Sequence, residues 1–212
     1  MTYSPALLPQ LIEAVADAIN QNADAVTELD QAIGDGDHVV NLQRGIQALM
    51  AQRDGLSQLE WAEAWQKIGM ILMSTVGGAS GSLLGTLFVA MAKAAKGQPL
   101  NLKGFATAFG QGVESVKLRG KSDAGDKTML DVLVPVAGYL LQVAGNPPAM
   151  ADVLEETGKV AIAGMESTRD MLATKGRASY LEERTRGHID AGAKTSQLII
   201  CAICTVLSAA PA

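Results

Sequence analysis

Residues 61–93 have the sequence WAEAWQKIGMILMSTVGGASGSLLGTLFVAMAK, and residues 68–92 within it carry no charge. This uncharged run is long enough to cross a bilayer as a single helix. Gly77 and Gly78 interrupt the run, however, and glycine is unfavourable in the interior of a helix. Before these glycines, apolar residues recur at helical spacing over residues 61–72. We therefore predict two buried helices that meet at the two glycines, and no membrane span.

Helical spacing of apolar residues also marks most of the remaining chain. Aromatic residues make up 4% of the sequence, and Val, Ile and Thr do not form alternating runs, so strands are disfavoured. Further helices are predicted at residues 7–19, 23–29, 41–52, 105–116, 129–143, 150–171 and 193–207. No repeat or change in composition marks a domain boundary. The prediction is therefore a single all-α domain over residues 1–212, a bundle of about eight helices.

The composition also restricts the possible partners and the compartment. The formal net charge is −5, whereas nucleic acids and anionic membrane surfaces attract basic proteins. We expect neither as a partner. The chain has two cysteines, too few for a disulfide scaffold, and its first residues lack the basic and apolar regions of a signal peptide. A cytoplasmic location is the expectation.

Three acids, Asp30, Asp35 and Asp37, fall within eight residues. The glycines between them allow the chain to turn, so that the carboxylates face one point. Carboxylates gathered in this way repel one another unless a cation neutralises them, and oxygen ligands suit Mg²⁺. The alternative is a turn that caps the following helix. The neighbouring His38 and Asn41 favour a binding site.

Three further polar or glycine-rich segments are candidates for ligand binding. Residues 77–81 (GGASG) could bind an anion through the backbone at a helix start, or could be a close-packed helix break. Residues 119–128 are not a P-loop, because Ser115 stands where that motif requires glycine, and a solvated polar loop is the alternative there. Arg177 lies in a polar segment over residues 174–192 and could supply a cation for phosphate; a surface loop is the alternative.

Taken together, these motifs resemble those of the nucleotide-binding L subunit of bacterial dihydroxyacetone kinases of the phosphotransferase-linked type. The resemblance runs nearly end to end and implies an antiparallel barrel of eight helices with a nucleotide at one rim. It rests on residues 32–38 (AIGDGDH), 77–81 (GGASG), 125–131 (GDKTMLD) and 176–180 (GRASY), followed by Gly187 and His188.

The resemblance also assigns a role to individual residues. It implies that Asp30, Asp35 and Asp37 hold two Mg²⁺ ions that bridge to the phosphates of ADP or ATP. It implies nucleotide contacts at His38, Asn41, Ala79, Ser80, Gly120, Met129, Arg177, Asp190 and Gly192.

Two positions depart from the family pattern. Val39 stands where the family usually has glycine, and would crowd a turn that required positive φ there. Ala191 stands where the family usually has proline, and its expected effect is a looser loop.

The function implied by the resemblance is phosphoryl transfer with partner subunits. ADP would be a coenzyme that a phosphohistidine-carrying M subunit rephosphorylates, and a separate K subunit would hold dihydroxyacetone covalently. No catalytic base is then expected on this chain, because substrate activation would occur on the partner. A homodimer of this chain is also expected.

Three alternatives remain open. An ATP-exchanging two-component triose or tetrose kinase would have a similar nucleotide domain. Fatty-acid kinases also have such a domain, but with further domains fused behind it. A non-catalytic helical bundle that binds lipid or protein would show no dependence on Mg²⁺ or nucleotide.

Overall fold

The computed structural model describes residues 3–210, and within them the chain forms ten α-helices and three 3-10 helices, with no strand. The all-α class predicted from the sequence is confirmed. The α-helices are α1 (Leu8–Gln21), α2 (Ala23–Ile33), α3 (His38–Met50), α4 (Arg53–Leu56), α5 (Trp61–Thr75), α6 (Gly78–Ala95), α7 (Leu102–Gly120), α8 (Leu130–Val143), α9 (Met150–Ser167) and α10 (Ala191–Ala209), and the 3-10 helices are η1 (Pro5–Leu7), η2 (Thr168–Asp170) and η3 (Arg177–Thr185).

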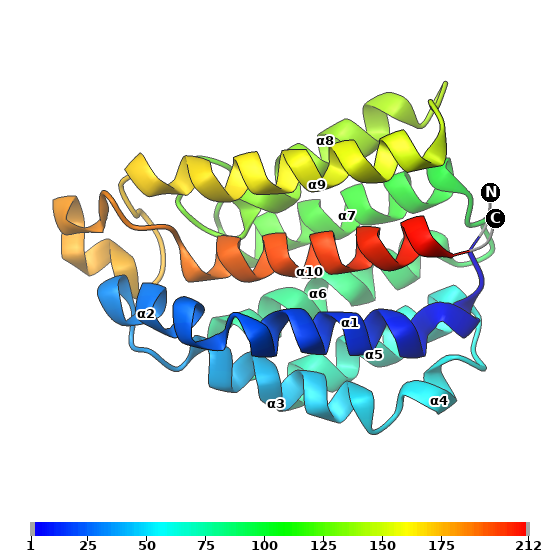
Figure 1. Ribbon diagram of the computed structural model, residues 1–212, viewed down its shortest axis with the longest axis horizontal. Helices are drawn as coiled ribbons and strands as arrows, with labels where there is room; N and C mark the ends of the chain where they lie inside the picture. The colour runs from blue at the N-terminus through cyan, green and yellow to red at the C-terminus, as the bar shows by residue number, and fades with distance from the viewer. Residues whose placement is uncertain (1–2, 211–212) are drawn as a thin grey trace.

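Eight of these helices contact one another in a closed cycle. Each packs against the next in the order α1, α3, α5, α6, α7, α8, α9, α10, and α10 packs against α1. Figure 1 shows them lying along the long axis of the molecule, with neighbours in the cycle running in opposite directions. The two remaining α-helices, α2 and α4, are shorter and make contacts at the ends of the cycle.

The alternating direction of the helices determines where the connections lie. The α2–α3, α5–α6, α7–α8 and α9–α10 connections all fall at the same end, on the left in Figure 1. We call this the site end, because it gathers the glycine-rich and acidic segments that the sequence presents as separate motifs. The start of α1 and the end of α10 lie toward the opposite end.

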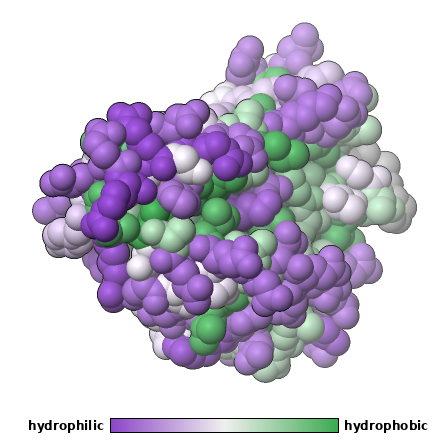
Figure 2. Space-filling model, turned by 60° about the vertical axis from the view of Figure 1, so that its left-hand side comes forward, coloured by the Kyte–Doolittle hydropathy of each residue, from purple (hydrophilic) through white to green (hydrophobic). Residues whose placement is uncertain are grey.

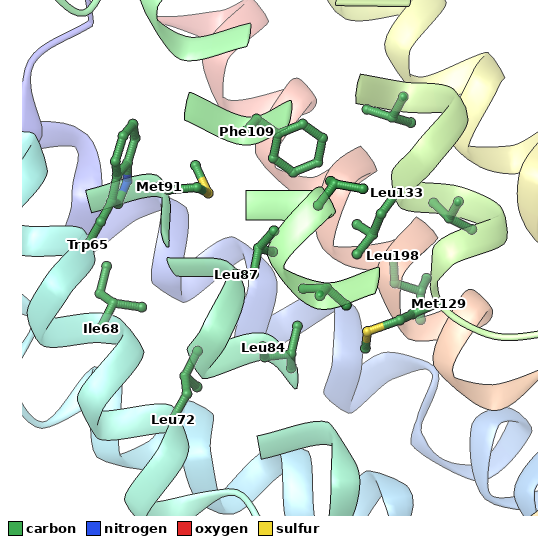
Figure 3. Packing of buried hydrophobic residues seen from close by; sticks show 14 of the residues in the cluster. Trp65, Ile68, Leu72, Leu84, Leu87, Met91, Phe109, Met129, Leu133 and Leu198 are labelled. Carbon is green, nitrogen blue, oxygen red and sulfur yellow. The ribbon is translucent and has the colours of Figure 1, made fainter. Parts of the chain in front are cut away.

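The core is built from the apolar faces of the long helices. Figure 3 shows side chains such as Trp65, Leu87 and Phe109 meeting from α5, α6 and α7, with Leu133 of α8 and Leu198 of α10 beside them. All of these side chains are buried. Burying a side chain of this kind contributes about 1.5–3 kcal/mol, so this apolar packing outweighs the modest helix propensity of individual residues.

The uncharged run divides as predicted at its two glycines. Helix α5 ends at Thr75 and α6 begins at Gly78, whose φ of 67° favours glycine. By length and composition alone, α6 and α10 could each cross a membrane. Each of them also packs against neighbours on both sides in the cycle, as core helices of a bundle do.

The polar segment 174–192 differs from the prediction. It was predicted as a loop, but it contains the 3-10 helix η3, which is interrupted at Glu182, where φ is 49°. Short 3-10 turns carry no apolar periodicity, so a search for helical spacing misses them.

Candidate functional site

The three acids converge at the site end. Asp30 lies in the last turn of α2, and Asp35 and Asp37 lie in the connection to α3. One carboxylate oxygen from each residue lies within 4.8 Å of the others. Gly36 turns the chain with a φ of 76°, and a side chain at Gly34 would collide with the Asp30 carboxylate. The local glycines therefore allow this convergence.

The donor set fits a hard divalent cation. All three groups are carboxylates, the residues are partly or fully exposed, and Asp30 also accepts a hydrogen bond from the backbone N–H of His38 at 3.1 Å. Oxygen donors with room for water and phosphate suit Mg²⁺. Arg177 of η3 lies against the acids, with its guanidinium 2.9 Å from the Asp35 carboxylate. The Arg177 segment and the acidic loop, predicted as separate motifs, thus meet here.

His38 connects three helices behind the acids. Its Nε2 atom lies 2.9 Å from the Thr195 hydroxyl on α10, and its Nδ1 atom lies 3.2 Å from the Ser80 hydroxyl on α6. Burial lowers the pKa of His38, although the carboxylates of Asp30, Asp37 and Asp35 act in the opposite direction. A neutral ring has one N–H donor and one acceptor nitrogen, which matches two hydroxyl partners. Thr195 belongs to no motif, and sequence analysis missed it.

Asn41 and Val39 face the interior of the bundle. The Asn41 carboxamide lies against Gly77, where an added Cβ would come within 2.5 Å of its Oδ1 atom, and this oxygen accepts a hydrogen bond from Arg44 at 3.3 Å. Val39 is buried within α3. Positive φ occurs at Gly36 and not at Val39. The expected crowding at Val39 is therefore absent.

Ala79 and Ser80 lie in the first turn of α6, the N-terminal end of which faces the site end. The N-cap residue of this helix is Gly77, and no side chain caps the helix. The N-terminus of a helix attracts anions through its backbone N–H groups and the helix dipole. Ser80 also reaches the acidic loop through His38. This part of the site is thus suited to phosphate.

The α7–α8 and α9–α10 connections complete the site end. Gly120 is the last residue of α7. Met129 is buried just before α8, and a Cβ added at Gly192 would lie 3.8 Å from the Cβ of Met129. Asp190 caps α10 by accepting a hydrogen bond from the backbone N–H of Ala193 at 2.7 Å. Ala191, the residue that follows Asp190, is buried as the first residue of α10. The looser loop expected there stays a prediction.

Among the acids of this region, Asp190 has the largest shift in pKa. Burial raises its pKa to about 7, and the carboxylates of Asp131 and Asp30 act in the same direction, while its hydrogen bond from Ala193 and the charge of Lys127 oppose them. An unfolded aspartate has a pKa of about 3.9, so the folded state holds this proton more tightly. The stability that results is present below about pH 4 and is lost as the pH rises to about 7.

We expect Asp190→Asn to remove this pH dependence. When the pH rises from 5 to 8 in the absence of metal, wild type should lose about 1 kcal/mol more unfolding free energy than the variant. This figure is reduced because Asp190 is partly exposed to water. Urea unfolding at both pH values in EDTA measures this difference. A difference that stays constant with pH would contradict the raised pKa.

Lys127, between α7 and α8, and Asp131, in the first turn of α8, are both buried. Lys127 has only 1% of its surface exposed and Asp131 only 2%. The Asp131 carboxylate accepts hydrogen bonds from the backbone N–H groups of Gly125 at 2.5 Å and Thr128 at 2.7 Å. The solvated-loop alternative for residues 119–128 therefore does not hold at Lys127. Asp131 lies in α8, within the helix predicted at residues 129–143. A single acid in the first turn of the otherwise apolar helix α8 was the available signal.

The surface of the site end is mainly polar. In Figure 2, whose view brings this end forward, hydrophilic side chains cover much of the surface, with smaller hydrophobic areas between them. Together, the fold and the site define an all-helical domain with an acidic cation site and an anion-attracting helix start at one end.

The chain belongs to the family described as the DAK2 domain, which matches residues 32–205. It is 37% identical to "PEP-dependent dihydroxyacetone kinase 1, ADP-binding subunit DhaL" of Listeria innocua, over 96% of this chain and 97% of that protein. It is also 37% identical to the ADP-binding subunit DhaL of the Escherichia coli PEP-dependent dihydroxyacetone kinase, over 91% of this chain and 92% of that one. The resemblance to the dihydroxyacetone kinase L subunit is confirmed.

A solved structure shares the fold. It is the dihydroxyacetone kinase from C. freundii in complex with AMP-PNP and Mg²⁺, with a TM-score of 0.74 and 24% sequence identity. The similarity covers 97% of this chain, which spans 34% of that kinase. At this identity the comparison supports the helical fold alone.

Proposed function

We propose that this chain is the nucleotide-binding subunit of a dihydroxyacetone kinase, in which Mg-ADP is a coenzyme that receives and passes on a phosphoryl group. Relatives named as ADP-binding DhaL subunits, which this chain matches over nearly their whole length, support the proposal. The observation that carries it is the convergence of Asp30, Asp35 and Asp37 beside the start of α6.

The acids and Arg177 would act on the phosphates. Asp30, Asp35 and Asp37 would hold two Mg²⁺ ions, which neutralise phosphate charge and orient the phosphoryl group for transfer when bound. The backbone N–H groups at Ala79 and Ser80 would bind phosphate oxygens at the N-terminus of α6. Arg177 would add a further positive charge close to the acids.

The remaining predicted contacts would bind and orient the nucleotide. His38 would keep Ser80 in place through its hydrogen bond to that hydroxyl, and the same ring is anchored by Thr195. Asn41 would support the chain at Gly77. The walls of the nucleotide pocket would come from Gly120, Met129, Asp190 and Gly192, which lie at the end of α7, between α7 and α8, before α10 and in the first turn of α10.

The reaction would require partner subunits. Phosphoryl transfer depends mainly on positioning and charge neutralisation, and the groups at this site supply both. The residue that activates dihydroxyacetone would lie on a K subunit, and the phosphoryl donor would be a phosphohistidine on an M subunit. We propose a homodimer of this chain in the cytoplasm.

Nucleotide retention tests the proposal. The purified chain, loaded with ADP and passed through gel filtration, is expected to retain about one ADP per chain in Mg²⁺ and to lose it in EDTA. Ready loss of nucleotide in Mg²⁺ would favour an ATP-exchanging kinase instead. No binding in either buffer would overturn the proposal and favour the non-catalytic bundle.

A further inference from the structure

Lys127 is a charged residue that the proposed mechanism does not use. It lies in the α7–α8 connection with a left-handed backbone (φ 61°), and only 1% of its surface is exposed. Lysine is rarely buried to this extent unless its charge is paired. Its ammonium group therefore needs partners within the protein that replace water.

The Lys127 ammonium group binds backbone carbonyls. It donates to the carbonyl oxygens of Thr168, of His188 at 2.5 Å and of Arg169 at 3.5 Å. An ammonium group has three N–H donors and no acceptor, so three carbonyls satisfy it fully. Burial lowers the pKa of Lys127, while the carboxylates of Asp190 and Asp131 favour its charged form.

These carbonyls lie at the two ends of one excursion of the chain. Thr168 and Arg169 follow α9, and His188 precedes α10, so the ammonium group joins both ends of the segment 170–187. The backbone N–H of Gly187 also donates to the Arg169 carbonyl at 2.8 Å. The segment that is closed in this way carries Arg177, which contacts Asp35.

The same side chain joins this excursion to the opposite wall of the site. Lys127 belongs to the connection that includes Met129. The residue before Lys127, Asp126, accepts a hydrogen bond at its carbonyl from the backbone N–H of Thr174 in the excursion, at 3.4 Å. The backbone N–H of Asp190, just beyond the excursion, donates to the Thr168 hydroxyl at 3.1 Å. One buried cation thus links the segments that bear Arg177, Asp190 and Met129.

We propose that Lys127 is a positioning residue that fastens the segment 170–187 to the α7–α8 connection and so holds Arg177 and Asp190 in place for the nucleotide. The structural part of this inference stands on the contacts above, and the nucleotide part rests on the proposed function. Lys127 acts on the nucleotide site through the backbone carbonyls of Thr168, Arg169 and His188.

The experiment compares Lys127→Met with wild type as full-length chains without nucleotide. The variant leaves the carbonyls without their buried donor, so the segment should open more often. Trypsin should cleave after Lys175, Arg177, Arg184 or Arg186 about tenfold faster, while far-UV circular dichroism stays unchanged. Hydrogen exchange should rise in residues 120–130 and 168–190 and remain unchanged in α5 and α6. The affinity for Mg-ADP should fall about tenfold.

Lys103→Met is the matched control, because Lys103 is an exposed lysine at the opposite end of the bundle. It should leave cleavage, exchange and affinity unchanged. Cleavage and exchange in Lys127→Met equal to those of wild type would overturn the proposal, whatever happens to ADP binding. Exchange that rose equally in every helix would also overturn it, because that result would indicate a general loss of stability.

If wild type fails to bind Mg-ADP, the proposed function fails, while cleavage and exchange still decide whether Lys127 fastens the segment. If Lys127→Met does not fold, Lys127→Gln replaces it, since its amide keeps two N–H donors without the charge. Cleavage faster than wild type is then expected, and cleavage at the wild-type rate would overturn the proposal.

Discussion

Replacing Asp37 with asparagine is expected to weaken Mg-ADP binding more than about 100-fold. Loss of a group that only orients a metal ligand usually weakens metal binding by about 10- to 100-fold, and loss of a ligand should weaken it more. The carboxylate oxygen of Asp37 lies within 4.8 Å of those of Asp30 and Asp35. An amide keeps the shape of the side chain but removes its negative charge, so the attraction for a divalent cation falls. Isothermal titration with ADP in Mg²⁺ measures the loss.

The same substitution should leave the metal-free protein intact. Asp37 occupies the N-cap position of α3, but its side chain makes no capping hydrogen bond, and asparagine is equally suited to that position. Removing one of three neighbouring negative charges also reduces their repulsion. The melting temperature in EDTA should therefore be unchanged or slightly higher.

A matched variant separates the site from a general charge effect. Asp17 is an exposed acid on α1, and Asp17→Asn changes the net charge by the same amount. It should bind Mg-ADP as wild type does. Wild-type affinity in Asp37→Asn would remove this carboxylate from the metal site. A large loss of helicity would instead show that the acid stabilises the fold.

The substitution Gly69→Ala is expected to lower the free energy of unfolding by about 2 kcal/mol, and the melting temperature by about 6 °C. Helices α5 and α6 approach closely at this point. A Cβ at Gly69 would lie 2.9 Å from the carbonyl oxygen of Gly85, and a Cβ at Gly85 would lie 2.8 Å from that of Gly69. Two backbones must therefore separate to admit one methyl group.

Gly138→Ala should have the opposite effect. Gly138 lies in the interior of α8, and a Cβ there would meet nothing within 4 Å. Alanine is a better helix residue than glycine, so the variant should gain roughly 0.5–1 kcal/mol. Urea unfolding of both variants measures the contrast. Equal stabilisation by both substitutions would show that α5 and α6 do not require the close approach.

Local patterns were enough to predict the helices and part of the site. The apolar spacing before Gly77 and the charge-free run after it predicted α5 and α6, because a helix buries residues that recur every three or four positions. The acids converge over a few residues of chain, and the turn depends on Gly36, which permits positive φ. These features involve neighbouring residues, so the sequence contains the information directly.

Long-range packing was needed for the rest. His38 and Thr195 are 157 residues apart, and no spacing relates them. For the segment with Lys127, the sequence left a solvated loop open as an alternative, whereas its charge is buried against carbonyls 41 and 61 residues further along the chain. Its burial becomes favourable only where those carbonyls replace water as hydrogen-bond partners.

The sequence by itself thus determined that this protein is a helical domain with an acidic turn between two helices, since periodicity and glycine placement act over short distances. Only the tertiary structure decided which contacts join the loops of the site. Adjacent helices run in opposite directions, so alternate connections meet at the same end of the bundle. There Arg177 reaches Asp35, and Lys127 reaches the ends of the segment that carries Arg177, through contacts that exist only once the helices have packed.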